Sequence, residues 1–257
     1  MSINDKSYKI RCDAFVANHY DDAPSFSRWR NRNLDQCNKP YIEAAKSHGG
    51  HILELGTATG MLTIPLAREE FHVRSIDISP YMHDVVRKKL AIEPEIISKR
   101  INLIVDNAIE YSPSDLFNMI VMPDGLFDAI TNQKLQIKLL ENCYRHLRKG
   151  GGLYFDFAKP PLENNDFPTY FRYRDHTGNI YIITVDTSIK PYKQLRSFNF
   201  LFEKYKSVDE PILVEHIYRY VYYGELQLML EYAGFSAINI DGDYANSRRF
   251  FVTAKKD

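Results

Sequence analysis

From residue 51 to residue 157 the sequence alternates short apolar runs with longer amphipathic segments, and this rhythm constrains the fold more than any other feature. Short buried strands that alternate with helices are typical of a parallel, doubly wound α/β sheet. The predicted strands are 51–55, 71–78, 101–105, 117–122 and 153–157. The helix predicted over 135–147 should end at the glycine run 150–152, because glycine adopts the left-handed C-cap conformation at little cost.

After residue 158 the rhythm changes. Apolar segments follow one another without helices between them, and such segments are expected to pair antiparallel. They span 171–174, 181–187, 195–206 and 212–223, and a helix over 225–233 and strands over 237–241 and 250–254 follow them. We therefore predict an α/β domain of seven main strands with an antiparallel β insertion after the fifth strand.

Charge and cysteine usage narrow the class of protein. Lys and Arg number 33, and Asp and Glu also number 33, so the chain lacks the basic excess of a nucleic-acid binder. The three cysteines are scattered and have no metal-ligand spacing, which predicts reduced thiols and no metal site. No apolar run approaches the roughly 20 residues of a membrane span, and no signal core is present. We expect a cytoplasmic protein without nucleic-acid or membrane partners.

A glycine-bearing loop follows the first predicted strand, in the segment Glu54-Leu55-Gly56-Thr57-Ala58-Thr59-Gly60. Open α/β sheets bind nucleotides at this position, and glycine lets the backbone turn sharply and approach the ligand. A dinucleotide site needs G-x-G-x-x-G, but Ala58 takes the place of the second glycine and Met61 that of the third. The acid before the loop would repel a pyrophosphate, whereas it could attract the ammonium or sulfonium of S-adenosylmethionine (SAM).

The next two predicted strands also end in acids. Asp77 ends the second strand, and its two carboxylate oxygens could accept both hydroxyls of a ribose. Asp106 follows the third strand, where its carboxylate could accept from an adenine amino group while the next backbone amide serves a ring nitrogen. Each acid alone could be a loop residue or a helix cap. Together, the three strand ends match the three parts of one SAM molecule.

On these residues the segment 51–157 resembles the class I SAM-dependent methyltransferase family, whose sheet is Rossmann-like. The resemblance implies that the methionine end, the ribose and the adenine of SAM meet successive strand ends. The implied cofactor-binding residues of the core are Glu54, Gly56, Thr57, Gly60, Asp77, Ile78, Asp106, Asn107, Ala108 and Met122. Among these, Ile78 matches the apolar residue that packs on the adenine face.

The insertion after the fifth strand looks like that of small-molecule N-methyltransferases, including glycine and aminosugar N-methyltransferases. The resemblance implies that residues 1–50 form a helical arm that covers SAM, that 51–257 form the methyltransferase core, and that 158–223 form a substrate or lid insertion. Tyr20, Trp29 and Arg32 are the arm's predicted cofactor contacts, although they could equally dock the arm onto the body.

Three residues are predicted to act on the methyl acceptor. Asp124, after the fourth strand, could hold an ammonium group or accept its proton, but the sequence Pro-Asp-Gly favours a simple turn. His216 could be a general base, because its usual pKa suits proton transfer near neutral pH. Tyr222 shares one face of the predicted strand 212–223 with His216, because side chains alternate along a strand. For both, packing against the main body is the alternative.

The sequence thus predicts methyl transfer from SAM to a nitrogen, or less favourably an oxygen, of a small molecule, as in secondary metabolism. The Asn-Pro-Pro-aromatic motif of many nucleic-acid and protein amino-methyltransferases is replaced by Met122-Pro123-Asp124-Gly125. Two alternatives stay open: a catalytically silent SAM-binding regulatory module, and an NAD-dependent oxidoreductase, which the glycine spacing disfavours. The antiparallel insertion also makes a homodimer plausible.

Overall fold

The computed structural model describes residues 6–23, 34–161, 168–242 and 249–257. The predictions on Trp29 and Arg32 lie outside these residues. The chain divides into two compact units. The core unit comprises Arg32–Pro160 and Arg219–Asp257, and the insertion unit comprises Met1–Asn31 and Pro161–Tyr218. The first 50 residues are therefore shared: α1 (Lys6–His19) belongs to the insertion unit and α3 (Leu34–His48) to the core unit. That the N-terminal arm covers the cofactor stays a prediction.

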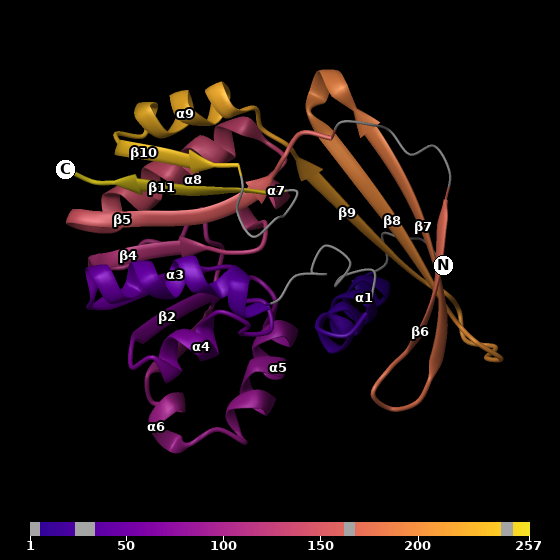
Figure 1. The fold of residues 1–257 in the computed structure, drawn as a ribbon. Helices are drawn as coiled ribbons and strands as arrows, with labels where there is room; N and C mark the ends of the chain where they lie inside the picture. Colours follow the sequence, from indigo (N-terminus) through magenta and orange to yellow (C-terminus); the bar gives the residue numbers. More distant parts are fainter. Residues whose placement is uncertain (1–5, 24–33, 162–167, 243–248) are drawn as a thin grey trace. The chain divides into compact units, whose positions relative to one another are not determined.

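The core unit is built on a seven-stranded sheet in the order β10-β11-β5-β4-β1-β2-β3 (Figure 1). Its strands are β1 (His51–Leu55), β2 (His72–Asp77), β3 (Ile101–Val105), β4 (Phe117–Met122), β5 (Leu147–Ala158), β10 (Ser236–Asp241) and β11 (Arg249–Lys255). The first five run parallel to one another, while β11 runs antiparallel to both β5 and β10. The predicted Rossmann-like α/β class is confirmed.

Helices cover both faces of this sheet, because alternate residues of each strand point to opposite sides. Leu53 of β1 packs with α8 (Gln133–His146) and α9 (Tyr223–Tyr232), whereas its neighbour Ile52 packs with α3 and α4 (Thr63–Arg68). The remaining helices of the core unit are α5 (Pro80–Leu90), α6 (Glu95–Ser98) and α7 (Leu126–Ala129). The strand order reverses between β1 and β4, and ligands bind open α/β sheets at such a switch point.

The predicted role of the glycine run is wrong. Helix α8 ends at His146, and the glycines 150–152 lie inside β5. The register with β4 shifts there, since Phe117 pairs with Leu147 but Met119 pairs with Gly152. A Cβ atom on Gly151 would lie 2.9 Å from the Arg148 carbonyl oxygen and 3.0 Å from that of Asn118. The glycines therefore allow an irregular strand in which backbones approach closely.

This packing gives a stability prediction. Gly151→Ala should lower the free energy of unfolding by about 2 kcal/mol, because the added methyl group meets two backbone carbonyls that cannot move independently. Gly224→Ala is the matched control, since nothing lies within 4 Å of its would-be Cβ. Urea unfolding of both variants measures the difference. Equal stabilities would contradict the close approach.

The insertion unit contains a second sheet in the order β6-β7-β8-β9, with α1 against one face. Its strands are β6 (Thr169–Arg174), β7 (Ile180–Lys190), β8 (Leu195–Lys204) and β9 (Ile212–Arg219), and a short 3-10 helix, η2 (Pro191–Lys193), joins β7 to β8. Strand β7 is antiparallel to β6 and to β8, as predicted. Phe15 of α1 meets Phe202 of β8 edge to face, with ring centroids 4.9 Å apart.

Strand β9 is shorter than predicted. It ends at Arg219, so Tyr222 does not lie on a strand with His216; instead Tyr222 is the residue that precedes α9. The strand ends because the chain enters the core: Arg219 is buried and donates to Gln136 and Glu225, and Val221 is buried in the core unit. The alternating tyrosines in the sequence therefore continue past the end of the strand.

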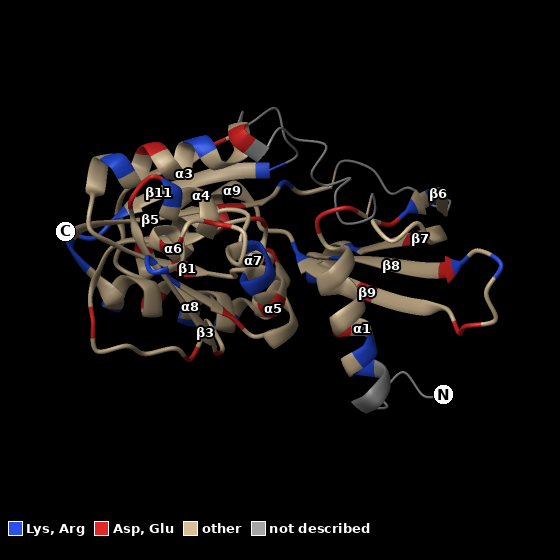
Figure 2. Ribbon diagram, turned by 90° about the horizontal axis from the view of Figure 1, so that it is seen from below, with Lys and Arg blue, Asp and Glu red and all other residues tan. Residues whose placement is uncertain are grey.

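Charged residues of both signs are interspersed over each unit (Figure 2). Helix α3, for example, carries an ion pair between Lys39 and Glu43 and another from Lys46 to Glu69. Among the described residues no helix is long and apolar enough to cross a membrane, and no group of three or more His, Cys, Asp or Glu could hold a metal ion.

Candidate active site at the carboxyl edge of the core sheet

The loop after β1 has the tight geometry that its glycines predict. Gly56 has φ +84° and Gly60 has φ +79°, both in the left-handed region. A Cβ on Gly56 would lie 3.3 Å from Leu126 of α7, and one on Gly60 would lie 3.2 Å from Val86 of α5. Ala58 also has a positive φ, of 46°. The loop therefore leaves no room for larger side chains at either glycine.

Glu54 is fully buried near the end of β1. Its Oε2 atom accepts hydrogen bonds from Thr63 Oγ1 at 2.5 Å and from Ser75 Oγ at 2.6 Å. Its Oε1 atom is buried and has no hydrogen-bond partner among the described residues. Burial raises the pKa of Glu54 to about 7. A buried carboxylate oxygen that lacks a hydrogen-bond donor, such as Glu54 Oε1, suits a ligand with a positively charged group that can donate to it.

Thr57 takes part in a buried polar network behind the loop. Its hydroxyl lies 2.7 Å from Ser75 Oγ and 3.2 Å from His83 Nε2. The Thr57 N–H donates to the Ile76 carbonyl oxygen at 3.0 Å, and a contact of Thr57 with the cofactor stays a prediction. His83 of α5 is completely buried, and burial lowers its pKa. Sequence reasoning missed His83 and Ser75, because neither stands in the glycine loop.

Asp77 and Ile78 lie at the end of β2, as predicted. Asp77 Oδ2 accepts the Ala58 N–H at 2.8 Å, and its Oδ1 accepts the Ser79 N–H at 2.9 Å. Each carboxylate oxygen keeps a further lone pair for a ligand hydroxyl. Ile78 is 73% exposed, so its apolar side chain is accessible to a flat ring packed on it.

Asp106 and Asn107 follow β3 and are exposed. The Asn107 N–H donates to Asp106 Oδ1 at 2.7 Å, so the predicted free backbone amide is used within the loop in this structure. The Asn107 side chain accepts the Ile109 N–H at 3.0 Å. Ala108 packs against the core. The carboxylate of Asp106 remains at the surface, at the same sheet edge as Asp77.

The turn after β4 is also as predicted. Met122, the last residue of β4, is fully buried. Asp124 has φ 54° and Gly125 has φ 93°, so two successive residues adopt the left-handed conformation. This conformation costs a residue with a side chain about 1 kcal/mol. The Asp124 N–H donates to Asp156 Oδ1 at 2.8 Å, which stabilises the turn.

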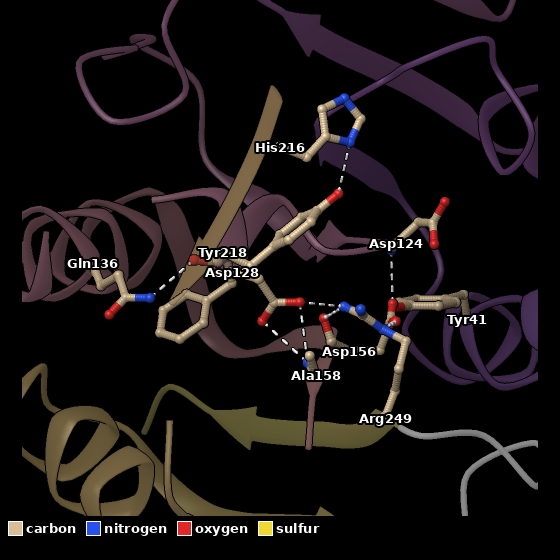
Figure 3. Close-up of polar contacts among 10 residues, drawn as sticks. Tyr41, Asp124, Asp128, Gln136, Asp156, Ala158, His216, Tyr218 and Arg249 are labelled. Carbon is tan, nitrogen blue, oxygen red and sulfur yellow. Dashed lines mark hydrogen bonds and ion pairs between the residues drawn. The ribbon is translucent and has the colours of Figure 1, made fainter. Parts of the chain in front are cut away.

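Behind this turn lies a buried cluster of charged side chains (Figure 3). Arg249 of β11 donates to Asp128 of α7 at 2.8 Å and to Asp156 of β5 through Nε. Asp128 also accepts the Ala158 N–H, at 3.0 and 3.1 Å. Burial raises the pKa of Asp128 to about 6, although Arg249 opposes this shift. Burial alone would lower the pKa of Arg249, but Asp156 and Asp128 raise it well above its usual value.

The remaining predicted residues are dispersed. His216, on β9 of the insertion unit, is half-buried, and its Nδ1 lies 3.1 Å from Tyr218 Oη. Burial lowers the pKa of His216 to about 4, so its imidazole is neutral but weakly basic at neutral pH. Tyr20 packs within the insertion unit, and Tyr222 of the core unit is 55% exposed. Their roles at the site stay predictions.

The part of the chain that forms this site matches a family of known proteins. Residues 52–151, which hold the glycine loop and all three strand-end acids, match the family model described as a methyltransferase domain. The chain carries a SAM-dependent methyltransferase domain. Its cofactor is SAM, and the buried Glu54 Oε1 and the exposed Ile78 fit the two ends of that molecule.

Proteins similar to this chain include methyltransferases of Streptomyces and Micromonospora. The cypemycin N-terminal methyltransferase of Streptomyces sp is 21% identical over 216 residues, which is 77% of each chain. The CcbJ methyltransferase of Streptomyces caelestis has a TM-score of 0.77 at 20% identity and covers 94% of this chain and 96% of its own. SAM-bound CalS10 of Micromonospora echinaspora, an amino pentose methyltransferase, has a TM-score of 0.71 at 13% identity, with 100% and 99% covered.

Proposed function

We propose that this methyltransferase transfers a methyl group from SAM to the nitrogen of a small aliphatic amine of secondary metabolism. The observation that carries the proposal is Asp124, a carboxylate in a rigid turn at the end of β4. Leu126 of α7, two residues further along, contacts Gly56 of the glycine loop. An acid beside the cofactor loop suits an amine better than a neutral hydroxyl, because it can pair with the ammonium form.

When bound, SAM supplies the electrophilic methyl group. Glu54, Asp77 and Asp106 would hold its ammonium group, ribose and adenine respectively, and the apolar Ile78 would pack on the adenine. A protonated amine has no lone pair, so its proton must leave before nitrogen can attack. Asp124 would hold the ammonium form by charge and accept an N–H hydrogen bond from the neutral form. The protein contributes chiefly by alignment and exclusion of water.

The similar proteins support nitrogen as the target without deciding it. One is named for an amino pentose and another for an N-terminal methyl transfer, and an aliphatic amine is common to both substrates. Cytoplasmic location, a homodimer and the absence of a nucleic-acid partner stay predictions. The alternative of a silent SAM-binding module would show cofactor binding without transfer.

A substrate assay separates these alternatives. The protein is incubated with methyl-labelled SAM and one of three probes: glucosamine, the dipeptide Ala-Gly, or glucose as the hydroxyl-only control. Mass spectrometry with fragmentation locates any added methyl group. Methylation of the amine in either nitrogen probe supports the proposal. Methylation only of hydroxyl groups would contradict it, and SAM binding without turnover of any amine would favour the silent module.

Asp124→Asn tests the acceptor contact. We expect the KM for the amine probe to rise at least about 10-fold, because the charge that holds the ammonium form is removed. The affinity for S-adenosylhomocysteine (SAH) should stay unchanged. Asp115→Asn is the control, since Asp115 precedes β4 at the opposite edge of the sheet and pairs with Arg74 at 2.7 Å. Equal KM values for both variants and the wild type would refute the role of Asp124.

A further inference from the structure

The buried cluster of Asp128, Asp156 and Arg249 behind Asp124 has no role in the proposed methyl transfer so far. Asp128, Asp156 and Arg249 are all buried, yet they come from α7, β5 and β11. Removing charges from water is costly, and a buried pair is retained only when further hydrogen bonds satisfy its remaining atoms. Here Arg249 Nη2 also donates to the Asp156 carbonyl oxygen at 2.9 Å. Such an arrangement calls for a functional explanation.

Asp156 connects the cluster to the acceptor turn. One of its oxygens, Oδ2, pairs with Arg249. The other, Oδ1, accepts the Tyr41 hydroxyl of α3 at 2.7 Å and the Asp124 N–H at 2.8 Å. The guanidinium and the tyrosine hydroxyl therefore hold the Asp156 carboxylate in the orientation that accepts the Asp124 N–H. Asp124 is in the left-handed conformation, which costs free energy for a residue with a side chain. The hydrogen bond from its N–H to Asp156 helps to offset that cost.

The same cluster contacts the next residues of the turn. A Cβ on Gly125 would lie 3.1 Å from Arg249 Nη2 and 3.2 Å from Asp128 Oδ2, so the charged groups pack directly against the Gly125 backbone. Asp128 then ties α7 to the end of β5 through the Ala158 N–H. Helix α7 begins with Leu126, which contacts the glycine loop at Gly56. One rigid segment thus carries both the acceptor acid and a contact to the cofactor loop.

We propose that Asp156, held by Arg249 and Tyr41, is a positioning residue that fixes the Asp124–Gly125 turn and so sets the direction of the Asp124 carboxylate. Figure 3 shows this carboxylate pointing away from Arg249, on the opposite side of Asp124 from the N–H that Asp156 holds. Asp156 itself has no contact with reacting atoms. The role assigned to Asp124 rests on the proposed function, whereas the rigidity of the turn does not.

Asp156→Asn tests the rigidity without an acceptor. The substitution keeps the shape of the side chain but removes the charge that pairs with Arg249. We expect hydrogen exchange in residues 123–129 to become at least about 10-fold faster, while the strands β1 and β4 keep their protection. The SAH affinity should stay within about 3-fold of the wild type. Asp175→Asn is the matched control, because Asp175 also accepts backbone N–H groups in a turn, of Thr177 and Asn179, in the insertion unit.

Turnover with the amine probe tests the link to Asp124. The kcat/KM of Asp156→Asn for the amine probe should fall at least about 10-fold, as it does for Asp124→Asn through its raised KM. Enzyme concentration is taken as the concentration of SAH-binding sites, so that only folded protein is counted. The double variant with Asp124→Asn should be no slower than the slower single variant, because both changes act through one carboxylate. If Asp156→Asn does not fold, Tyr41→Phe removes one donor to the same oxygen without a charge change and should show the same pattern at about 3-fold.

Unchanged exchange in residues 123–129 would overturn the positioning role, as would a wild-type kcat/KM for the amine probe. Losses that multiply in the double variant would also overturn it, because they would show that Asp156 and Asp124 act independently. If the wild type methylates neither glucosamine nor Ala-Gly, the proposed function fails. The exchange and SAH measurements then still decide whether Asp156 holds the turn.

Discussion

Replacing Asp77 with alanine is expected to abolish most of the affinity for SAH, by at least about 100-fold, since hydrogen bonds to a charged group are each worth about 1.5–3 kcal/mol. Two effects add. The ribose hydroxyls lose their acceptor, and the Ala58 N–H of the glycine loop loses the carboxylate that holds it at 2.8 Å. The loss should appear in isothermal titration calorimetry as a much weaker or undetectable heat of binding.

Asp77→Asn separates these two effects. Its amide oxygen can still accept the Ala58 N–H, so the loop should keep its conformation, while the ribose meets only one acceptor. We expect an intermediate affinity. Asp84→Ala is the control, because Asp84 is exposed on α5 and pairs with the exposed Arg87 at 2.8 Å. SAH affinity equal to that of the wild type in Asp77→Ala would refute the ribose assignment.

Glu54→Gln is expected to stabilise the protein without ligand and to weaken SAH binding. The pKa of Glu54 is raised to about 7 in the folded state, above its ordinary value of 4.5. A carboxyl group with a raised folded-state pKa favours folding at low pH, and this contribution is lost as the pH rises from about 4.5 to about 7. At pH 8 the variant should therefore be more stable than the wild type, by up to about 3 kcal/mol.

The ligand should respond in the opposite direction. The buried Oε1 atom of ionised Glu54 has no donor in the part of the chain that the structure describes, and the ammonium group of SAH would supply one. Wild-type affinity should rise as the pH passes through about 7, whereas the affinity of the variant should be weaker and nearly constant there. Urea unfolding and calorimetry at pH 6, 7 and 8 measure both effects. Glu43→Gln, an exposed change on α3, should follow the wild type. Parallel curves for Glu54→Gln and the wild type would contradict this account.

Sequence predicted the sheet well, because most of its strands are short apolar runs between amphipathic helices. Strands β1, β3 and β4 begin and end at the predicted residues, and β11 closes the sheet antiparallel to β5. A short apolar run between two amphipathic helices is more readily assigned to a strand than to another helix. Helix-ending signals were less reliable. The glycines 150–152 suit a helix C-cap as well as an irregular strand, and only the close approach of the Asn118 carbonyl decides between them.

The site could be predicted only where its residues are local in sequence. Glu54, Asp77 and Asp106 follow consecutive strands, so their shared edge follows from topology alone. The cluster that fixes Asp124 could not be found in this way, because Arg249 is 121 residues from Asp128 and 93 from Asp156. The surroundings of Glu54 were hidden too, because Thr63 and Ser75, which donate to its Oε2 atom, come from other elements. Its Oε1 atom has no hydrogen-bond partner among the described residues.

Calorimetric titration of the wild-type protein with SAH and, separately, with NAD tests the central claim most directly. The claim is that the three strand-end acids Glu54, Asp77 and Asp106 form one site for the adenosine and amino-acid ends of SAM. We predict saturable binding of one SAH per chain and no binding of NAD. Binding of NAD without binding of SAH would contradict the account.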